Sequence, residues 1–446
     1  MISETIERAL EQSSIADELR ERISNKTARV GVLGLGYVGL PLAVEFARAG
    51  FQVTGIDLVS RKVDQINRGE SYIRDVKDST FRPLVESGKL RATTDFSVIR
   101  ELDTIDICVP TPLRKTKDPD MSFVIAASDA IAEHMHPGLL VMLESTTYPG
   151  TTEELVLPKL RAGGLIVGED FFLCFSPERV DPGNPKYQTS NIPKVVGGVT
   201  ATCTEIGALF YQQALETVVP VSSTRVAEMV KLLENTFRMI NIGLVNELAM
   251  MCDRMGIDVW EVIDAAATKP FGFMPFYPGP GLGGHCIPID PFYLSWKSKE
   301  AGMEARFIEL AGYINGHMPE FVVEKIQNAL NDASKPIRGS RIHVLGTAYK
   351  RDIDDVRESP ALDIMLLLQR RGAVVTFSDP QVRSIQIDGV ELEGEEMLPA
   401  IEAADCVVIV TDHSGIDYGG VVERSKLIVD TRNALKGHRS EKIVRL

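Results

Sequence analysis

Ala28-Arg-Val-Gly-Val-Leu-Gly-Leu-Gly-Tyr-Val-Gly39 joins an apolar run to three glycines spaced as G-x-G-x-x-G. The run predicts a strand, the segment from Ala43 to Ala49 predicts a helix that Gly50 ends, and Phe51-Gln-Val-Thr-Gly-Ile56 predicts a second strand. Asp57 follows that strand, eighteen residues after the last glycine. Glycines in this context, with an acid at this distance, are typical of a dinucleotide-binding fold. The alternative is a glycine turn in an α/β domain without a cofactor.

Each glycine has its own role in such a motif. Gly34 permits the tight turn, Gly36 lets the backbone approach a pyrophosphate, and Gly39 lets the helix pack closely on the strand. The amino end of the helix then faces the phosphates with the positive end of its dipole. Asp57 would bind the ribose hydroxyls, which favours NAD over NADP because a 2′-phosphate would meet a like charge. The basic pair Arg61-Lys62 nearby keeps NADP open.

Size and charge restrict the function further. The chain has 446 residues, which suggests two or three domains, and a formal net charge of −14. That charge argues against nucleic acid or an anionic membrane as a partner. Six cysteines without paired spacing predict neither a disulfide framework nor a metal site, and they fit a reducing cytoplasm. We expect no signal segment or membrane span, because the amino terminus is polar and no apolar run approaches roughly 20 residues.

Three further strand patterns lead to polar loops that contain proline. The runs are Ile105–Val109, Leu139–Leu143 and Phe171–Phe175. In doubly wound sheets ligands bind at the carboxyl ends of the strands, so Thr111, Thr146 and Glu178 should border the cofactor. Proline and a hydroxyl at a strand end are also ordinary turn chemistry, and for any one loop that interpretation stays open.

The pattern becomes helical after about residue 215. From Ser222 to about Met255 apolar residues recur at helical spacing, and Lys231 lies four residues before Asn235, hence on the same face. A lysine in such a helix usually extends to solvent, whereas Lys231 beside Asn235 in a crevice would hold an oxyanion. Further helices are predicted over Asp258–Ala267 and Met303–Asn331. We expect an amino-terminal helical arm over 1–27, a NAD-binding domain over 28–214 and a helical dimerisation domain over 215–330.

A second α/β half follows over 331–446, with strands predicted near residues 341, 374, 404 and 427. The turn after Gly346 reads Thr-Ala-Tyr-Lys-Arg-Asp and lacks the second and third glycines. This half should therefore not hold a dinucleotide in the same way. A nucleoside diphosphate held by Lys350 or Arg432 is the alternative, although either cation could be a surface charge.

The loop from Pro278 to Pro291 reads Pro-Gly-Pro-Gly-Leu-Gly-Gly-His-Cys-Ile-Pro-Ile-Asp-Pro. Its glycines and prolines predict a fixed loop that is neither helix interior nor central strand. Cys286 follows His285 and precedes Asp290 by four residues. A thiol on a rigid loop with ionisable neighbours is a candidate nucleophile, and a buried structural cysteine is the alternative.

Taken in order, these motifs resemble the UDP-glucose/GDP-mannose dehydrogenase family from about residue 28 to the end. The matching segments are Gly34–Pro41, Pro110–Pro112, Ser145-Thr146, Ser176–Arg179, Lys231–Asn235, Gly283–Asp290, Tyr349-Lys350, Arg357–Pro360 and Asp430–Asn433. The resemblance implies two Rossmann-like doubly wound domains joined by a long central helix, assembled as a homodimer or larger oligomer. It also implies a cytoplasmic role in making precursors of surface polysaccharide such as lipopolysaccharide. His285 before the cysteine and Pro288-Ile-Asp290 after it resemble members that oxidise UDP-N-acetylhexosamines, most closely UDP-N-acetylglucosamine. The galacto and manno epimers and UDP-glucose stay open.

The resemblance implies that two NAD in turn oxidise the C6 alcohol of the sugar to a carboxylate. Cys286 would capture the aldehyde as a thiohemiacetal, which a second oxidation turns into a thioester that water hydrolyses. Lys231 and Asn235 would stabilise oxyanions, Asp290 and Thr146 would place the water, and Glu178 would be a base or an acid. Implied cofactor contacts are Gly34, Gly36, Tyr37, Val38, Gly39, Asp57, Lys62, Val109, Thr111, Thr146 and Arg357. Implied substrate contacts are Glu178, Lys231, Asn235, Tyr277, Gly283, Lys350 and Arg432.

Two other functions compete with this one. A two-electron dehydrogenase of the β-hydroxyacid type also pairs a Rossmann domain with a helical domain carrying lysine and asparagine. It has no use for Cys286 or for the second α/β half. A non-enzymatic NAD sensor would hold the cofactor but would not need the lysine, asparagine, cysteine and aspartate together.

Overall fold

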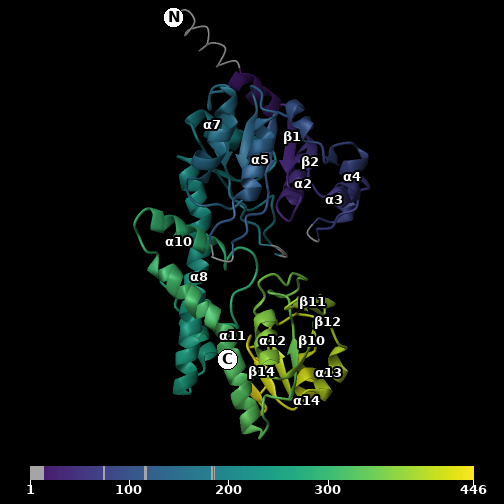
Figure 1. Ribbon diagram of the computed structural model, residues 1–446, viewed down its shortest axis with the longest axis vertical. Coiled ribbons are helices and arrows are strands. Elements are labelled where there is room, and N and C mark those ends of the chain that lie inside the picture. Colours follow the sequence, from purple (N-terminus) through teal and green to yellow (C-terminus); the bar gives the residue numbers. More distant parts are fainter. Residues whose placement is uncertain (1–14, 74–75, 115–117, 182–183, 185) are drawn as a thin grey trace, which may run out of the picture. The chain divides into compact units, whose positions relative to one another are not determined.

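The computed structural model describes residues 15–73, 76–114, 118–181, 184 and 186–446 (Figure 1). The chain divides into two compact units, Met1–Glu234 and Asn235–Leu446, and each contains a mostly or wholly parallel sheet with its own core. Helix α8 (Thr224–Met255) contributes residues to both units. Residues 1–14 of the predicted amino-terminal arm lie outside the described residues. Its residues 15–24 are helical, and Leu19 and Ile23 pack into the core of the first unit.

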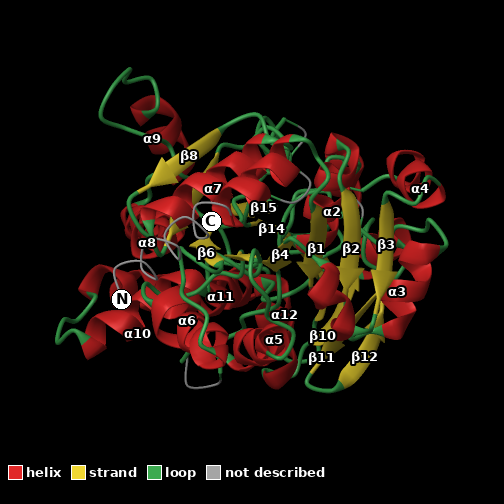
Figure 2. Ribbon diagram, turned by 90° about the horizontal axis from the view of Figure 1, so that it is seen from above, coloured by secondary structure: helices red, strands yellow, loops and turns green. Residues whose placement is uncertain are grey.

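In the described residues the first unit contains a sheet of eight strands in the order β3-β2-β1-β4-β5-β6-β7-β8. The strands are β1 (Arg29–Leu33), β2 (Gln52–Ile56), β3 (Leu90–Thr93), β4 (Thr104–Ile107), β5 (Leu140–Leu143), β6 (Phe172–Phe175), β7 (Lys194–Gly198) and β8 (Val218–Val221). Strands β1, β2 and β3 lie side by side in Figure 2. The strands run parallel as far as β6, whereas β7 pairs with β6 in the antiparallel sense and β8 runs parallel to β7. The order 3-2-1-4-5-6 is that of doubly wound dinucleotide-binding domains. The five strands predicted here form, but β3, β7 and β8 were not predicted.

The helices of this unit include α2 (Gly39–Ala49), α3 (Ser60–Asn67), α4 (Asp78–Glu86), α5 (Ser122–Ala132), α6 (Leu157–Leu160) and α7 (Ala201–Gln212). Every residue of β4, β5 and β6 is buried, as expected for parallel strands whose two faces are both covered. Phe46 of α2 stacks on Phe210 of α7 with ring centroids 4.4 Å apart, so these two helices share one core. Because α2 packs on β1 and β2 and α7 packs on β6, β7 and β8, this core extends along most of the sheet.

The second unit contains a parallel sheet in the order β10-β9-β13-β14-β15. Its strands are β9 (Arg341–Leu345), β10 (Val374–Ser378), β13 (Cys406–Ile409), β14 (Ile428–Asp430) and β15 (Ile443–Arg445), and β11 (Ser384–Ile387) and β12 (Val390–Glu393) form a separate hairpin. Its helices include α12 (Pro360–Arg370), α13 (Met397–Ala403) and α14 (Tyr418–Arg424). Counted from β9 the order is 2-1-3-4-5, so the direction reverses between β9 and β13, where such sheets bind ligands. The second α/β half is therefore Rossmann-like, as predicted.

The remaining helices are α9 (Val259–Ala266), α10 (Asp290–Glu300) and α11 (Arg306–Asp332). Gly243 of α8 lies against Ala311 of α11, and Asn246 Nδ2 donates to Asn315 Oδ1 across 2.8 Å. The helices predicted near α8, α9 and α11 form, but α10 was not predicted. It begins at Asp290, inside the stretch expected to be loop. Pro291 permits this because the first helical turn does not use its missing N–H.

Candidate functional site

The glycine loop after β1 has the shape that a pyrophosphate needs. Gly34 has φ +95°, and a Cβ there would lie 2.6 Å from the carbonyl oxygen of Cys108. A Cβ on Gly39 would lie 1.9 Å from the carbonyl oxygen of Gly34, so α2 packs onto the turn as closely as backbone allows. At Gly36 no atom lies within 4 Å of that position, so this side of the loop is open to a ligand. Tyr37 is exposed and Val38 half-buried beside it.

Asp57 is buried at the carboxyl end of β2 and binds the backbone of the glycine loop. Its carboxylate accepts hydrogen bonds from the backbone N–H of Leu35 (3.0 Å) and of Val59 (2.9 Å). The ammonium of Lys62 lies 3.2 Å from the same carboxylate. Asp57 is therefore fixed beside the glycine loop, where ribose hydroxyls are expected, and Lys62 balances its charge.

The loops after β4 and β5 are joined at the same edge of the sheet. Ser145 Oγ donates to the carbonyl oxygen of Val109 across 2.8 Å. Thr111 is buried, and Val109 and Thr146 are half-buried. Three of the predicted cofactor contacts thus lie on neighbouring loops next to the glycine turn.

Glu178, after β6, is held as a carboxylate by several donors. Its Oε1 accepts from the backbone N–H groups of Arg179 and Val180, each across 2.7 Å. Its Oε2 lies 3.2 Å from the ammonium of Lys194. Burial alone would raise the pKa of Glu178, but Lys194, the backbone donors and the charge of Lys231 together lower it. Glu178 is therefore suited to accept protons and hydrogen bonds.

Lys231 lies on α8 with only 7% of its surface exposed, so its ammonium does not extend to solvent. One turn earlier, buried Glu228 accepts from the backbone N–H of Gly150 (2.5 Å) and from the N–H (2.9 Å) and Oγ1 (2.7 Å) of Thr152. Burial raises the pKa of Glu228 to about 7. This carboxyl group fastens α8 to the loop that follows Thr146.

In the second unit Asn235 and Asp290 form a buried pair. Asn235 Nδ2 donates to Asp290 Oδ2 across 2.6 Å. The carbonyl oxygen of Cys286 accepts from the backbone N–H of Ile289 (3.1 Å) and of Asp290 (2.8 Å), so the cysteine forms the turn that enters α10. Cys286 is exposed, whereas the other five cysteines of the described chain are buried. The structure therefore brings Cys286, Asn235 and Asp290 together around one helix end.

The glycines before the cysteine are packed against Tyr349. A Cβ on Gly283 would lie 2.6 Å from Tyr349 Cβ, and one on Gly284 would lie 2.7 Å from its ring. Gly284 N–H donates to the carbonyl oxygen of Arg357 across 3.0 Å. Burial, and next the charge of Arg357, lowers the pKa of His285. The segment after β9 thus supports the cysteine loop, and Arg357 itself pairs with Asp355 within the second unit.

Two predicted substrate residues of this unit, Lys350 and Arg432, lie near the reversal of strand direction, whereas Tyr277 contacts the end of α9. Lys350 is on the turn after β9, next to Tyr349. Arg432, after β14, donates from Nε to the carbonyl oxygen of Val410 (2.9 Å), and its guanidinium lies against Gly279. Tyr277 is exposed, and its hydroxyl donates to Asp264 Oδ1 across 2.9 Å. Arg432 thus connects this edge of the sheet to the start of the cysteine loop.

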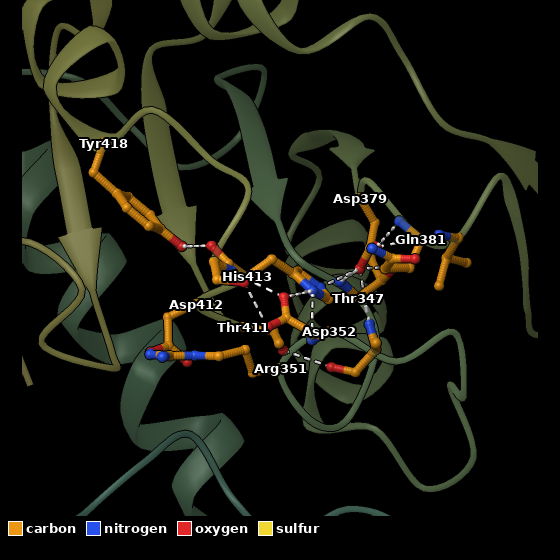
Figure 3. Close-up of polar contacts among 12 residues, drawn as sticks. Thr347, Arg351, Asp352, Asp379, Gln381, Thr411, Asp412, His413 and Tyr418 are labelled. Carbon is orange, nitrogen blue, oxygen red and sulfur yellow. Dashed lines mark hydrogen bonds and ion pairs between the residues drawn. The ribbon is translucent and has the colours of Figure 1, made fainter. Parts of the chain in front are cut away.

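A polar cluster around His413 fixes the turn that carries Lys350 (Figure 3). Asp379, after β10, accepts from the backbone N–H of Thr347 (2.6 Å) and of Ala348 (3.0 Å). Asp352 N–H donates to His413 Nδ1 (2.9 Å), so the ring proton lies on Nε2, which donates to Asp379 Oδ2 across 3.1 Å. The side chains of His413 and Asp379 are fully buried.

Comparisons with known proteins agree with this architecture. Residues 28–215 match the NAD binding domain of the UDP-glucose/GDP-mannose dehydrogenase family, residues 225–317 its central domain, and residues 343–437 its UDP binding domain. UDP-N-acetyl-D-mannosamine dehydrogenase of Pyrococcus horikoshii is 36% identical over 92% of this chain and 96% of its own. The chain belongs to the UDP-glucose/GDP-mannose dehydrogenase family.

One other relative and one solved structure extend the comparison. UDP-N-acetyl-D-glucosamine 6-dehydrogenase of Salmonella typhi is 34% identical over 93% of this chain and 98% of its own. A solved structure of UDP-D-ManNAc dehydrogenase from Pyrococcus horikoshii superposes with a TM-score of 0.86, at 34% identity, over 94% of this chain and 98% of that one. The protein is an NAD-dependent UDP-sugar dehydrogenase, and both competing interpretations, the β-hydroxyacid type and the sensor, are wrong. Within the described residues, no helix combines the length and the apolarity needed to cross a membrane.

Several residues of this dehydrogenase were missed by the sequence analysis. The polar side chains of Glu144, Lys194, Glu228, Asp379 and His413 are all buried and contact loops of the candidate site. None belongs to a glycine-rich or cysteine motif. A charged residue inside an apolar run, as in Pro193-Lys-Val-Val-Gly-Gly198, is the one signal that could have found Lys194.

Proposed function

We propose that the protein oxidises the C6 alcohol of a UDP-N-acetylhexosamine to the carboxylate, with UDP-N-acetylglucosamine as its first candidate substrate. The observation that carries this proposal is the exposed thiol of Cys286 at the turn into α10, beside the buried pair of Asn235 and Asp290. A two-electron alcohol dehydrogenase has no need of a nucleophile. An enzyme that carries an aldehyde on to an acid needs one, so that the aldehyde stays bound.

NAD supplies the hydride acceptor for both oxidations. The open backbone at Gly36 and the fixed carboxylate of Asp57 fit its pyrophosphate and its ribose. Contacts from Tyr37, Val38, Lys62, Val109, Thr111, Thr146 and Arg357 are part of this proposal. The negative charge of Asp57 favours NAD over NADP.

The thiol acts between the two oxidations. Cys286 adds through its sulfur to the aldehyde carbon, and the aldehyde oxygen becomes the hydroxyl of a thiohemiacetal. Loss of a hydride from the same carbon to NAD, and of the hydroxyl proton to a base, gives a thioester. Water then adds to the thioester carbon, the C–S bond breaks, and the uronic acid leaves with the thiol regenerated.

The buried polar groups stabilise charge and place water. Lys231 and Asn235 lie four residues apart on one face of α8 and are the proposed donors to the oxyanion at each step. Asp290 orients the hydrolytic water, since its carboxylate is already fixed by Asn235. Thr146 positions that water, and Glu178 accepts hydrogen bonds from water or substrate.

The UDP part of the substrate is assigned to the second α/β half. Lys350 and Arg432 supply positive charge for the diphosphate at the edge where the strand order reverses. Gly283 offers backbone, and Tyr277 offers a ring next to Trp260, whose centroid is 6.0 Å away. The uronic acid product would serve as a precursor of surface polysaccharide.

The configuration at C2 separates the two leading candidates. The sequence from Gly283 to Asp290 supports UDP-N-acetylglucosamine, and the relative from Salmonella typhi bears that activity in its name. UDP-N-acetylmannosamine is the second candidate, because the relative from Pyrococcus horikoshii is named for it at slightly higher identity.

The experiment is NADH release from purified protein with NAD and a panel of UDP-sugars. Two NADH per UDP-N-acetylglucosamine consumed would support the whole proposal. Two NADH per UDP-N-acetylmannosamine would support the mechanism and make that epimer the substrate. One NADH per sugar with any substrate would contradict the role given to Cys286.

We also propose that two copies of the chain associate through α8. Leu244, Leu248, Met251 and Met255 are exposed, and their spacing of four, three and four residues puts them on one face of the helix. In a dimer these four side chains would pack against the same four side chains of a second copy. Sedimentation of the double variant Leu248→Lys/Met251→Lys should show a monomer. The control Val390→Lys, on the exposed β12 strand, should keep the mass of the wild type.

A further inference from the structure

A buried lysine connects two carboxylates at the carboxyl edge of the first sheet. Lys194 is the first residue of β7, and its ammonium lies 2.5 Å from Glu144 Oε2 and 3.2 Å from Glu178 Oε2. The exposed fractions of these side chains are 5% for Lys194, 0% for Glu144 and 13% for Glu178. Glu144 directly follows β5 and Glu178 follows β6, so the ammonium lies between the ends of two strands that pair with each other.

Glu144 continues the connection away from the site. The hydroxyl of Tyr211 on α7 donates to Glu144 Oε1 and lies 2.7 Å from Asp106 Oδ1 on β4. One hydroxyl proton serves one acceptor, so one of the two carboxyl groups carries a proton of its own, and we assign it to Asp106 because Glu144 is paired with Lys194. Burial, and next the charge of Glu144, raises the pKa of Asp106 well above its ordinary range, which fits that assignment. The sequence of hydrogen bonds then runs from Asp106 through Tyr211 to Glu144, which Lys194 links to Glu178.

The other charged groups around Glu178 do not replace Lys194. Arg179 directs its guanidinium to Glu234, with the closest atoms 2.6 Å apart. The thiol of Cys108 stays neutral, because burial and the charge of Glu144 raise its pKa. Lys231 adds a second positive charge that also lowers the pKa of Glu178, after Lys194 and the backbone N–H of Val180. Lys194 is therefore the largest charged contribution to the ionised state of Glu178.

We propose that Lys194 is a positioning residue for the oxidation. Its ammonium holds Glu178 as an ionised carboxylate of fixed orientation, and Glu144 is the second carboxylate that this ammonium pairs with. The inference rests on the proposed function of Glu178. A carboxylate held in this way cannot donate a proton. Glu178 therefore accepts hydrogen bonds, or a proton from water, and the choice between base and acid is settled in favour of the base.

The test must separate this role from simple stability. Lys194→Met alone leaves the negative charge of Glu144 buried without an opposite charge beside it, which destabilises a fold strongly. The double variant Lys194→Met/Glu144→Gln removes both charges and keeps the volume of both side chains. Glu144→Gln alone is the matched control, because Lys194 then still faces Glu178. Lys194→Arg tests rescue by a cation of another shape.

The first measurement is the titration of Glu178 itself, independent of activity. Protein labelled with carbon-13 at the glutamate side-chain carboxyl is titrated by NMR, and Glu178→Gln assigns the signal. The double variant should raise the titration midpoint of Glu178 by about one pH unit or more, as expected for loss of an adjacent opposite charge. Glu144→Gln should not raise it. An unchanged midpoint in the folded double variant would overturn the proposal.

The second measurement is the pH profile of NADH formation. Activity that needs ionised Glu178 falls as the pH drops through its pKa, so the acid limb of kcat should move to higher pH in the double variant. Lys194→Arg should restore the limb. If the wild type releases no NADH from any UDP-sugar, the proposed function fails, while the NMR titration still decides what Lys194 does to Glu178. A limb that stays in place while the midpoint moves would leave Glu178 without the role in turnover that Lys194 is proposed to serve.

Discussion

Asp379→Asn is the substitution whose effect can be worked out most fully from the structure. The carboxylate accepts from the backbone N–H of Gln381 and Val382 through Oδ1, and from Thr347, Ala348 and His413 through Oδ2. Burial alone would raise the pKa of Asp379, but these donors lower it from 3.8 to about 2. At about 1.4 kcal/mol per pKa unit, this shift corresponds to about 2.5 kcal/mol of stability at neutral pH.

The amide adds a further penalty. Whichever oxygen of Asp379 becomes the NH2 group, at least two backbone N–H groups lose their acceptor, which costs about 1–3 kcal/mol for a buried group. We therefore expect Asp379→Asn to lower the free energy of unfolding by about 4 kcal/mol at neutral pH. Because the folded pKa is lowered, the contribution is complete above the unfolded pKa and disappears as the pH falls through the folded one. The difference between the wild type and the variant should shrink by about 1 kcal/mol at about pH 3.

The assay follows tryptophan fluorescence in urea. The chain has two tryptophans, Trp260 and Trp296, and both lie in the second unit, so the signal reports on the unit that contains Asp379. Asp388→Asn is the control, because Asp388 is exposed in the turn between β11 and β12. Its effect should stay within about 0.5 kcal/mol. A loss below about 1 kcal/mol for Asp379→Asn, or a loss that does not change with pH, would refute the reasoning.

Three further predictions concern the proposed chemistry. Cys286→Ser should abolish net formation of the uronic acid while keeping slow first oxidation or trapping an ester, as mass spectrometry would show; normal turnover would return Cys286 to a structural role. Lys231→Ala should lower kcat by about a hundredfold or more without a matching loss of melting temperature, and an unaffected rate would contradict its position at the oxyanion. Asp57→Ser should lower kcat/KM for NAD and raise it for NADP, because a 2′-phosphate no longer meets a negative charge; an unchanged ratio would exclude Asp57 from cofactor choice.

Local sequence patterns were sufficient to predict elements with a regular spacing of apolar residues and turns that require glycine. The turn at Gly34 and the close packing at Gly39 were predicted correctly, because a position that needs positive φ or close backbone contact requires glycine, which is visible in the sequence. The long helix α8 was found because its apolar spacing continues through all of its 32 residues. Strand β3 was missed because Leu-Arg-Ala-Thr alternates too briefly to be distinguished from loop.

The contacts of Lys194 could not be predicted for a different reason. They depend on the antiparallel pairing of β7 with β6. The spacing of apolar residues along the sequence does not indicate which distant segments pair. Helix α10 shows the opposite failure, in which Pro291 was interpreted as a sign of loop although the first turn of a helix accepts it. In both cases the residue was visible, but its role was set by tertiary structure.

In both sheets an aspartate at the end of the second strand holds the turn that follows the first strand. In the first unit the turn after β1 is held by Asp57 at the end of β2, through the backbone N–H of Leu35. In the second unit the turn after β9 is held by Asp379 at the end of β10, through the N–H groups of Thr347 and Ala348. Both acids therefore anchor a backbone turn, and only the first has glycines that leave the turn open to a pyrophosphate.

This parallel changes how a substitution of Asp57 must be interpreted. Loss of the carboxylate removes an acceptor of Leu35 N–H as well as a charge near the ribose, so Asp57→Ser alters turn geometry and cofactor choice together. Asp57→Asn keeps an acceptor oxygen for Leu35 while removing the charge. If the charge decides the cofactor, Asn and Ser should both raise the use of NADP. If turn geometry decides it, only Ser should change the ratio, and Asn should behave as the wild type does.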